Sequence, residues 1–457
     1  MNIRPFKAYR FNKEIVGDAG SCIAPPYDVI DTAHQQVLYE KNAYNIVRAI
    51  KGKKEANDTE SNNVYTRAAD YLTKAIEDGA LTQEASEAIY VYVQDFEIGG
   101  NQYERTGIIA LGGLTAFGEG VQPHEKTLEG PKADRLNLTR ATACQLGQIF
   151  MLYDDPANVD RTIIANALTK EAVIDMTDDQ QARHRLFVID EPALIEAFVS
   201  MMTDKQTVIA DGHHRYETAL NYWSETQNEQ AAYQMLSFVN MRNEGLVIQP
   251  THRLLINMTD FDAAALLDEL KQEFEVTKFA FDGDTDKQQA REGMFKKMQQ
   301  AGAENENVFG FYAADNAFYA ILLKKTEAMS ALCPEMSDAA LKLDVNVLHK
   351  LILEKHLGIC DAKLPGESHL GYITDLGDAI DKSITKVDSG QSDGVFFMNA
   401  THIEQVQAVA SAGEKMPQKS TFFYPKIFSG LTVRKLDIEP IKPQFTNSNL
   451  IGQECSK

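Results

Sequence analysis

The chain has 457 residues, 44% of them hydrophobic and 24% charged, which fits about two to four globular domains and argues against wholesale disorder. Lysine and arginine total 45 against 66 aspartates and glutamates, which gives a net charge of −21. Such a surface repels nucleic-acid backbones and anionic lipids at long range. We therefore expect no nucleic-acid partner, although a local basic pocket for a phosphate remains compatible with this charge.

The cysteines and the beginning of the chain indicate a reducing, cytoplasmic setting. No Cys-x-x-Cys pair is present, so neither a zinc ribbon nor a disulfide framework is indicated. The first ten residues lack the apolar stretch of a signal peptide, and no run of about 18 apolar residues could span a membrane. We expect a cytoplasmic protein with no membrane partner; its oligomeric state stays open. The five scattered cysteines are Cys22, Cys144, Cys333, Cys360 and Cys455.

The first part of the chain alternates helical and strand patterns. The two prolines of Ala24-Pro25-Pro26-Tyr27-Asp28 fix an extended backbone. The turn Gly99-Gly100-Asn101 joins two strands rich in β-branched residues, which predicts a hairpin. Residues 118–135 read as a charged loop, with a helix from Asn137 onward. Further helices are expected at 31–41, 62–78, 193–202 and 216–224, and strands at 88–94, 105–111, 148–153, 207–210 and 232–240.

The remainder predicts a second body built from a β-α-β-α-β-β run. Its strands are expected at 254–257, 276–281, 308–312, 318–323 and 395–398, and its helices at 261–274, 287–300, 344–356 and 402–410. Residues 413–431 read as a loop, and the tail from Pro440 as loose. The expected division is 1–250 as the catalytic core, 251–330 as a small α+β domain, 331–440 as a C-terminal region and 441–457 as a tail.

The segment Asp211-Gly212-His213-His214-Arg215 carries the densest chemistry. It follows a short apolar strand and precedes a helix, so the unpaired backbone N–H groups of the helix start can hold a phosphate. Gly212 would let the backbone approach a ligand, either histidine could move a proton, and Arg215 offers a planar fork to phosphate oxygens. Asp211 could hold Mg²⁺. The alternative is a polar turn that binds an anion without chemistry.

Two further charged segments are candidates. The first contains His124-Glu125-Lys126-Thr127 with Lys132, Asp134, Arg135 and Arg140, and could supply a base and a phosphate clamp; a solvated charged loop is the alternative. The second, residues 415–426, places three lysines, Lys419 among them, beside aromatic residues that could cover a nucleotide; a strand with surface lysines is equally compatible. Neither a Walker A motif nor a G-x-G-x-x-G or G-x-S-x-G segment is present.

Several segments in order resemble one family over essentially the whole chain. These are Arg4-Pro5-Phe6, residues 24–30, residues 211–216 and Met416-Pro417-Gln418-Lys419-Ser420-Thr421, and they resemble the prokaryotic "domain of unknown function ten-fifteen" family. The D-G-H-H-R segment also resembles the phosphate-binding turn of the ParB/sulfiredoxin fold, above all that of the free serine kinases. That resemblance implies phosphate contacts from His213, His214 and Arg215, and help from Asp211 with magnesium or the hydroxyl. It also implies an acidic base elsewhere, for which Glu125 comes first and Asp28 and Glu217 follow.

These observations predict an α+β protein with a ParB/sulfiredoxin-like nucleotide-binding core and an additional C-terminal α+β region. The expected function is nucleotide-dependent phosphorylation of a small metabolite, with free L-serine as the best single guess and ATP or ADP with Mg²⁺ as cofactors. The rivals are a phosphatase acting through the same site and a nucleotide-sensing regulator without turnover. Expected catalytic residues are Glu125, Asp211, His213 and His214; expected nucleotide contacts are Gly212, Arg215, Lys126, Lys132, Arg135 and Lys419; expected substrate contacts are Tyr27, Asp28 and Glu217.

Overall fold

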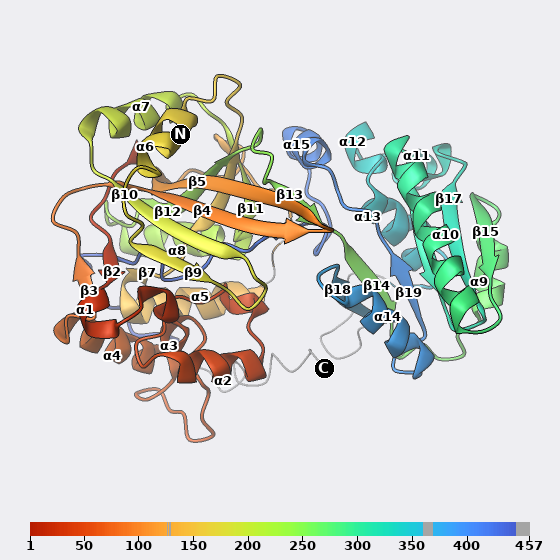
Figure 1. Cartoon of the computed structure of the whole chain (residues 1–457), viewed down its shortest axis with the longest axis horizontal. Helices are drawn as coiled ribbons and strands as arrows, with labels where there is room; N and C mark the ends of the chain where they lie inside the picture. The colour runs from red at the N-terminus through yellow and green to blue at the C-terminus, as the bar shows by residue number, and fades with distance from the viewer. Residues whose placement is uncertain (126, 128, 360–368, 445–457) are drawn as a thin grey trace. The chain divides into compact units, whose positions relative to one another are not determined.

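The chain folds into two compact units, each with its own sheet. The computed structural model describes residues 1–125, 127, 129–359 and 369–444 (Figure 1). The first unit comprises residues 1–123, 127–247 and 425–457, and the second comprises 124–126 and 248–424. The expected boundary near residue 250 lies close to Val247, whereas the segments divided at residue 330 share the second unit because their strands join one sheet. Both units mix helices with strands.

The first unit is built on a nine-stranded mixed sheet. Its path is β6-β11-β8-β12-β5-β4-β10-β9, with β1 paired to β5. The strands are β1 (Ile3–Arg4), β4 (Ile89–Ile98), β5 (Asn101–Gly113), β6 (Val121–Gln122), β8 (Ile149–Tyr153), β9 (Ile174–Thr177), β10 (Arg183–Ile189), β11 (Thr207–Asp211) and β12 (Tyr233–Asn240). Strand β8 runs parallel to β12 and antiparallel to β11. Short pairs join β2 (Tyr9–Phe11) to β3 (Leu81–Gln83), and β7 (Cys144–Gln145) to β21 (Arg434–Lys435).

The predicted hairpin of this sheet is confirmed. Strands β4 and β5 pair antiparallel from Tyr90 with Ile109 to Ile98 with Asn101. Gly99 and Gly100 adopt φ values of 58° and 80°, in the left-handed region that glycine enters without a steric penalty. The two-residue turn therefore fixes the register of the longest pairing in the unit.

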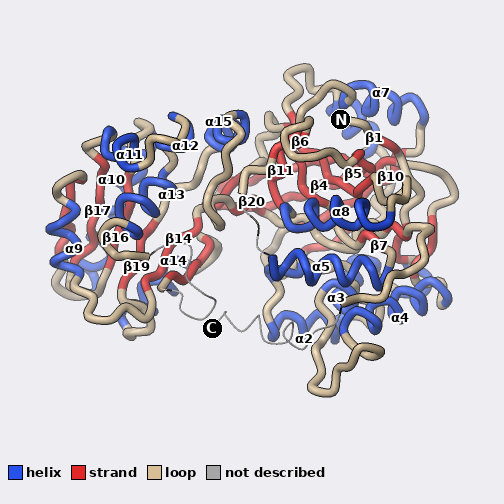
Figure 2. Tube along the Cα trace, turned by 180° about the vertical axis from the view of Figure 1, so that it is seen from behind, coloured by secondary structure: helices blue, strands red, loops and turns tan. Residues whose placement is uncertain are grey.

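The helices of the first unit pack partly on the sheet and partly on one another. The helices of the unit are α1 (Lys13–Val16), η1 (Ala19–Cys22), η2 (Tyr27–Val29), α2 (Thr32–Lys41), α3 (Val47–Ile50), α4 (Val64–Glu77), α5 (Glu129–Thr142), α6 (Asp160–Ala167), α7 (Pro192–Met202) and α8 (His213–Thr226). Alternate residues of the central strands form one core with α6, α7 and α8. Helix α5 packs on α8, and α4 packs on α5 (Figure 2).

The second unit is a three-layer arrangement around an antiparallel sheet of order β15-β17-β16-β19-β14-β18. One face packs against α9, α11, α13 and η3, and the other against α10 and α14. The predicted order of strands and helices from residue 254 to 323 is confirmed. The elements are β13 (Val247–Gln249), β14 (Thr251–Leu255), α9 (Ala263–Leu270), β15 (Phe274–Ala280), α10 (Asp284–Ala303), β16 (Val308–Tyr312), β17 (Ala317–Leu323), α11 (Glu327–Leu332), α12 (Asp338–Leu341), α13 (Asp344–Val347), η3 (Leu348–Glu354), β18 (Leu370–Thr374), α14 (Ala379–Asp388), β19 (Gly394–Phe397), α15 (Ile403–Ser411) and β20 (Phe422–Tyr424).

Three local expectations are wrong. Residues 129–135, expected as part of a loop, form the start of α5, because Pro131 stands in the first helical turn, where its missing N–H costs no hydrogen bond. Helix α8 begins at His213 rather than at Tyr216, so both histidines belong to its first turn. The segment 413–431 contains strand β20, which pairs with β13. Within the described residues, no helix is both long and apolar enough to cross a membrane.

Candidate functional site

The turn between β11 and α8 gathers the chemistry predicted for residues 211–215. Gly212 caps α8 with φ of 98° and makes no side-chain cap hydrogen bond. The first turn contains no acidic residue; instead it carries His213, His214 and Arg215. A cation such as Arg215 at the positive end of a helix dipole is unfavourable by roughly 0.3–1 kcal/mol. An anion at this turn would offset that charge and interact favourably with the helix start.

Arg215 folds back over the turn. A Cβ atom on Gly212 would lie 2.9 Å from Nη2 of Arg215, so a larger residue there would require the guanidinium to move. Nη1 donates to the carbonyl oxygen of Gln148, and Nη2 lies 3.5 Å from Oδ2 of Asp211. The other carboxylate oxygen of Asp211 lies 3.7 Å from Nζ of Lys426. Asp211 thus holds two cations at the end of β11.

The surroundings of Asp211 therefore do not suit a magnesium ion. Its carboxylate faces the cations of Arg215 and Lys426, and a bare metal ion would have to compete with both. Among the described residues, no group of three or more histidine, cysteine, aspartate or glutamate side chains could hold a metal ion. The expected Mg²⁺ at Asp211 has no support from this geometry, and no step below depends on it.

His214 lies among carboxylates but is held neutral. Burial lowers its pKa below the ordinary value of 6.5, and the nearby charges of Asp28 and Glu217 only partly oppose this. Lys132 adds to the lowering. Asp28 is exposed on η2, and Glu217 stands one helical turn after His213 on α8. An unprotonated imidazole beside two carboxylates can accept a proton near neutral pH.

Helix α5 adds two cations to the same region. Nζ of Lys132 lies 2.9 Å from Oε2 of Glu217, whose other oxygen accepts a hydrogen bond from Thr127 at 2.9 Å. The guanidinium of Arg135 lies 4.0 Å from the centre of the Tyr27 ring. It also pairs with Asp134 and donates to the carbonyl oxygen of Ile50. The expected contacts Tyr27, Asp28, Lys132, Arg135 and Glu217 thus all lie in the first unit with Arg215.

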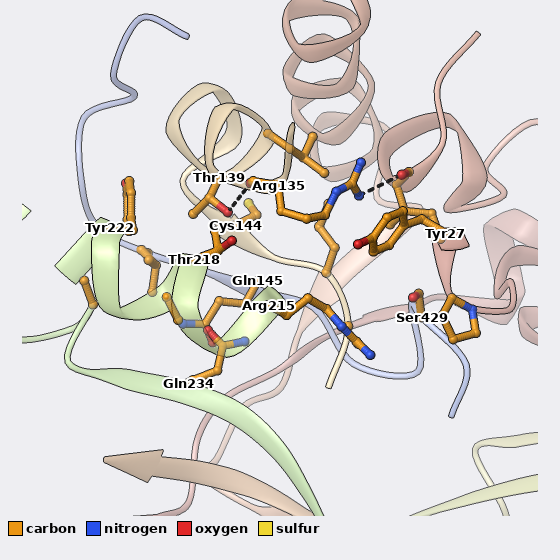
Figure 3. A pocket seen from close by; sticks show the side chains of 18 residues that line it. Tyr27, Arg135, Thr139, Cys144, Gln145, Arg215, Thr218, Tyr222, Gln234 and Ser429 are labelled. Carbon is orange, nitrogen blue, oxygen red and sulfur yellow. Dashed lines mark hydrogen bonds between the residues drawn. The ribbon is translucent and has the colours of Figure 1, made fainter. Parts of the chain in front are cut away.

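A pocket opens between the facing sides of α5 and α8. Its cavity volume is about 80 Å³, and the pocket opens to solvent. Figure 3 shows Arg135 and Arg215 among the side chains that line it, with Tyr27 and Ser429 toward one end. Gly147 also lines the pocket, and a Cβ atom there would lie 2.9 Å from Oγ of Ser429.

Glu125 and Lys419 lie in the second unit and contact each other. Oε1 of Glu125 accepts a hydrogen bond from the backbone N–H of Lys419 at 3.0 Å, and Glu125 forms a parallel bridge with Met416. His124 is fully buried, and its Nε2 lies 2.9 Å from Oγ1 of Thr421. The structure thus joins the two charged segments that the sequence left separate. Lys126 lies outside the described residues.

Two pocket residues of the first unit were not predicted from the sequence. Tyr222 and Gln234 line the pocket, and nothing in the sequence context of Gln234 indicates a site. A detectable signal existed for Tyr222: it follows Arg215, Thr218 and Ala219 at the spacing of one helix face. Lys426, one of the three lysines of the predicted segment 415–426, lies in the first unit and pairs with Asp211.

The solved structures to which the chain is similar have low sequence identity and TM-scores under 0.5. A conserved hypothetical protein from Pyrococcus furiosus is 13% identical, with 70% of this chain and 94% of that chain covered and a TM-score of 0.32. A free serine kinase in complex with AMP is 12% identical, with 69% and 86% covered and a TM-score of 0.33. SbnI with a C-terminal truncation from Staphylococcus aureus is 11% identical, with 70% and 84% covered and a TM-score of 0.32.

The family itself is clear. The model of the family described as "Protein of unknown function (DUF1015)" matches residues 3–346, most of the 457-residue chain, and the chain belongs to this family. The expected membership is thereby confirmed. No curated protein matches the chain.

Proposed function

We propose that the first unit is a nucleotide-dependent phosphotransferase that phosphorylates the hydroxyl group of a small metabolite. The single observation that carries this proposal is the start of α8, where Gly212 provides no side-chain cap and His213, His214 and Arg215 form the first turn. The resemblance of D-G-H-H-R to the turn of the ParB/sulfiredoxin fold supports the same assignment, and we place the first unit in that fold. ATP or ADP is the proposed donor.

The phosphates are held by charge and by oriented donors. The amides at the start of α8 and the guanidinium of Arg215 face the same turn, which suits the planar, multiply charged oxygens of a phosphoryl group. Phosphoryl transfer needs positioning and charge stabilisation more than covalent chemistry. Lys426 and Lys132 add positive charge to the region while balancing Asp211 and Glu217.

His214 is the proposed base. Because burial keeps its pKa below 6.5, the imidazole is neutral near pH 7 and can take the proton of the acceptor hydroxyl. The hydroxyl oxygen then forms a bond to the terminal phosphorus, and the bond from that phosphorus to the bridging oxygen of the nucleotide breaks. The products are a phosphate monoester and the nucleotide with one phosphate fewer, and the proton remains on His214 until solvent removes it.

The acceptor we favour is free L-serine. Asp28 and Glu217 place negative charge beside His214, which suits the ammonium group of an amino acid. Asp28 is exposed and so accessible to such a ligand. The serine assignment otherwise rests on the resemblance of residues 211–215 to the free serine kinases.

The test is a product screen by mass spectrometry. The purified chain is incubated with ATP or ADP, with and without Mg²⁺, and with a panel of free amino acids and small alcohols. We expect O-phosphoserine from serine, and a loss of at least about 100-fold in H214A and R215A. H34A and R183A are matched controls, since His34 is on α2 and Arg183 pairs with Asp175 on the sheet surface.

Each outcome decides between the readings. Full product formation by both H214A and R215A would overturn the assignment of the site. Phosphate release from phosphoserine without nucleotide would favour the phosphatase, and tight nucleotide binding without any product would favour the sensor.

A further inference from the structure

The pocket beside Arg215 is lined by residues of two facing helices, and on each helix these residues follow the helical repeat. On α8 it is lined by Arg215, Thr218, Ala219 and Tyr222, which recur at the three- and four-residue spacing of one helical face. On α5 it is lined by Arg135 and by the next turn of the same face. Arg215 and Tyr222 are seven positions apart and so lie about 10 Å apart along the axis of α8, comparable with the length of a nucleoside monophosphate.

The two ends of the pocket differ in chemistry. At one end Arg135, Arg215 and Tyr27 lie together, with the ring of Tyr27 against the guanidinium of Arg135. At the other end Tyr222 packs with Ala231 and Leu436 in a small apolar cluster. Figure 3 shows Tyr222 apart from Tyr27 and Ser429, with Arg215 between them. A ligand that fits has an anionic head and a largely apolar body.

The charges of the lining exclude an amino acid as occupant. Both charged residues that line the pocket are arginines, and no aspartate or glutamate is among the lining residues. An ammonium group would therefore meet no counter-charge inside it, which is costly away from water. In a chain of net charge −21, a cavity lined by two cations and no anion is a local exception that favours an anion.

The apolar end carries polar groups without protein partners. The Tyr222 side chain is only 2% exposed, and its hydroxyl has no hydrogen-bond partner. Such buried, unsatisfied groups are rare and call for an explanation. The carboxamide of Gln234 lines the same pocket and, among the described residues, has no hydrogen-bond partner. By contrast, the carboxamide of Gln145 is held by Tyr233 and Met235 at both ends.

We propose that this pocket holds the base of the nucleotide, with the phosphates directed toward Arg215 and the start of α8. The proposal rests on the proposed function and adds where the donor is recognised. The apolar walls cover the faces of the base, while the Gln234 carboxamide and the Tyr222 hydroxyl bind its polar edge. The metabolite acceptor then binds outside this pocket, toward Asp28 and His214.

The chain offers its own probe for this binding. Trp223 is its single tryptophan, follows Tyr222 directly on α8 and packs against the same apolar cluster. Its fluorescence should change as ADP fills the pocket. We would titrate ADP, ribose 5-phosphate and inorganic pyrophosphate into the full chain and its variants. The unmodified chain should bind ADP at least tenfold more tightly than ribose 5-phosphate.

Three variants test the base end. Y222F and Q234L should each weaken ADP binding about 5- to 10-fold and leave pyrophosphate binding unchanged. A219L should block ADP but not pyrophosphate, because the longer side chain extends into the empty space. Y44F and Q83L are the matched controls: Tyr44 bonds Asp78 at the surface and Gln83 is exposed on β3, both outside the pocket. Circular dichroism confirms that each variant is folded.

The outcomes separate the two proposals. If ADP binds and Y222F, Q234L and A219L all bind it like the unmodified chain, the base lies elsewhere and this inference is overturned while the phosphotransferase proposal stands. Equal affinity for ADP and ribose 5-phosphate would likewise overturn it. If neither ADP nor pyrophosphate binds, the proposed function fails, and this inference fails with it.

Discussion

Two arginines, one in each unit, show how the same side chain serves different ends. Arg253 on β14 in the second unit is 1% exposed; its Nη atoms donate to the carbonyl oxygens of Thr251 and Lys419, and its Nε has no partner. Arg215 on α8 in the first unit lies beside a left-handed glycine, an uncapped helix start and a pocket. Burial lowers the pKa of Arg253 to about 10, so its guanidinium is charged near neutral pH.

A buried cation therefore does not by itself define a ligand-binding site. Arg253 binds backbone oxygens that the fold must satisfy in any case, so its contribution is to stability. Arg215 binds a backbone carbonyl and Asp211, but it also lies at a helix start without an acidic residue and lines a pocket, where an anion could bind. The variants below separate these roles.

The largest expected effect is the loss of phosphoryl transfer in R215A. Removing the guanidinium from the start of α8 should lower kcat/KM at least about 100-fold, since it stabilises charge that develops in the transition state. The melting temperature should fall by only a few degrees. Steady-state kinetics with calorimetric melting would test this, and an unchanged kcat/KM would contradict it.

Next in size is the stability loss in R253M. The carbonyl oxygens of Thr251 and Lys419 would each lose a charged donor. Each loss should lower the free energy of unfolding by about 1–3 kcal/mol. Urea denaturation should show a lower midpoint, while ADP binding below the transition stays as in the unmodified chain. A loss of ADP affinity without a loss of stability would contradict a purely structural role and show that Arg253 contributes to ADP binding.

A smaller effect is expected from G212A. Its φ of 98° disfavours any residue with a Cβ, and that atom would press on the Arg215 guanidinium. We expect a cost of about 1–2 kcal/mol in stability together with weaker ADP binding. G79A tests the backbone effect alone, because Gly79 also has a left-handed φ, of 72°, but no atom lies within 4 Å of the added Cβ. If G79A and G212A bind ADP equally well, the contact between the added Cβ atom and the Arg215 guanidinium does not affect ADP binding.

The smallest effect is a dependence of stability on pH. Because the pKa of His214 is lower in the folded chain than 6.5, the unfolded chain takes up the proton first as the pH falls. The stability contribution of neutral His214 is therefore complete above pH 6.5 and declines below it. Melting curves of the unmodified chain and H214A between pH 5 and 7.5 should converge toward the acidic end. Parallel curves would show that His214 titrates normally.

The sequence predicted local features better than long-range ones. The β11 turn and the β4–β5 hairpin were predictable because glycines follow or join apolar strands, and both are local. The start of α5 was not, because Gly130-Pro131 is typical of a loop although proline is tolerated in a first helical turn.

Contacts between distant segments were beyond the sequence. Glu125 meets Lys419, and Asp211 meets Lys426, through pairings of strands and loops that no periodicity encodes. The pocket depended on such contacts too, because α5, α8 and the segment around Ser429 meet only in the folded unit. The motif was therefore visible in advance, whereas the pocket beside it was not.

The measurement that tests the central claim most directly is product formation from serine and ATP or ADP by the unmodified chain, R215A and R253M, each held below its melting transition. The account predicts O-phosphoserine from the unmodified chain and from R253M at similar rates, and at least about 100-fold less from R215A. Equal rates from R215A and R253M, or no product from the unmodified chain with either nucleotide, would contradict the assignment of the α8 start as a phosphoryl-transfer site.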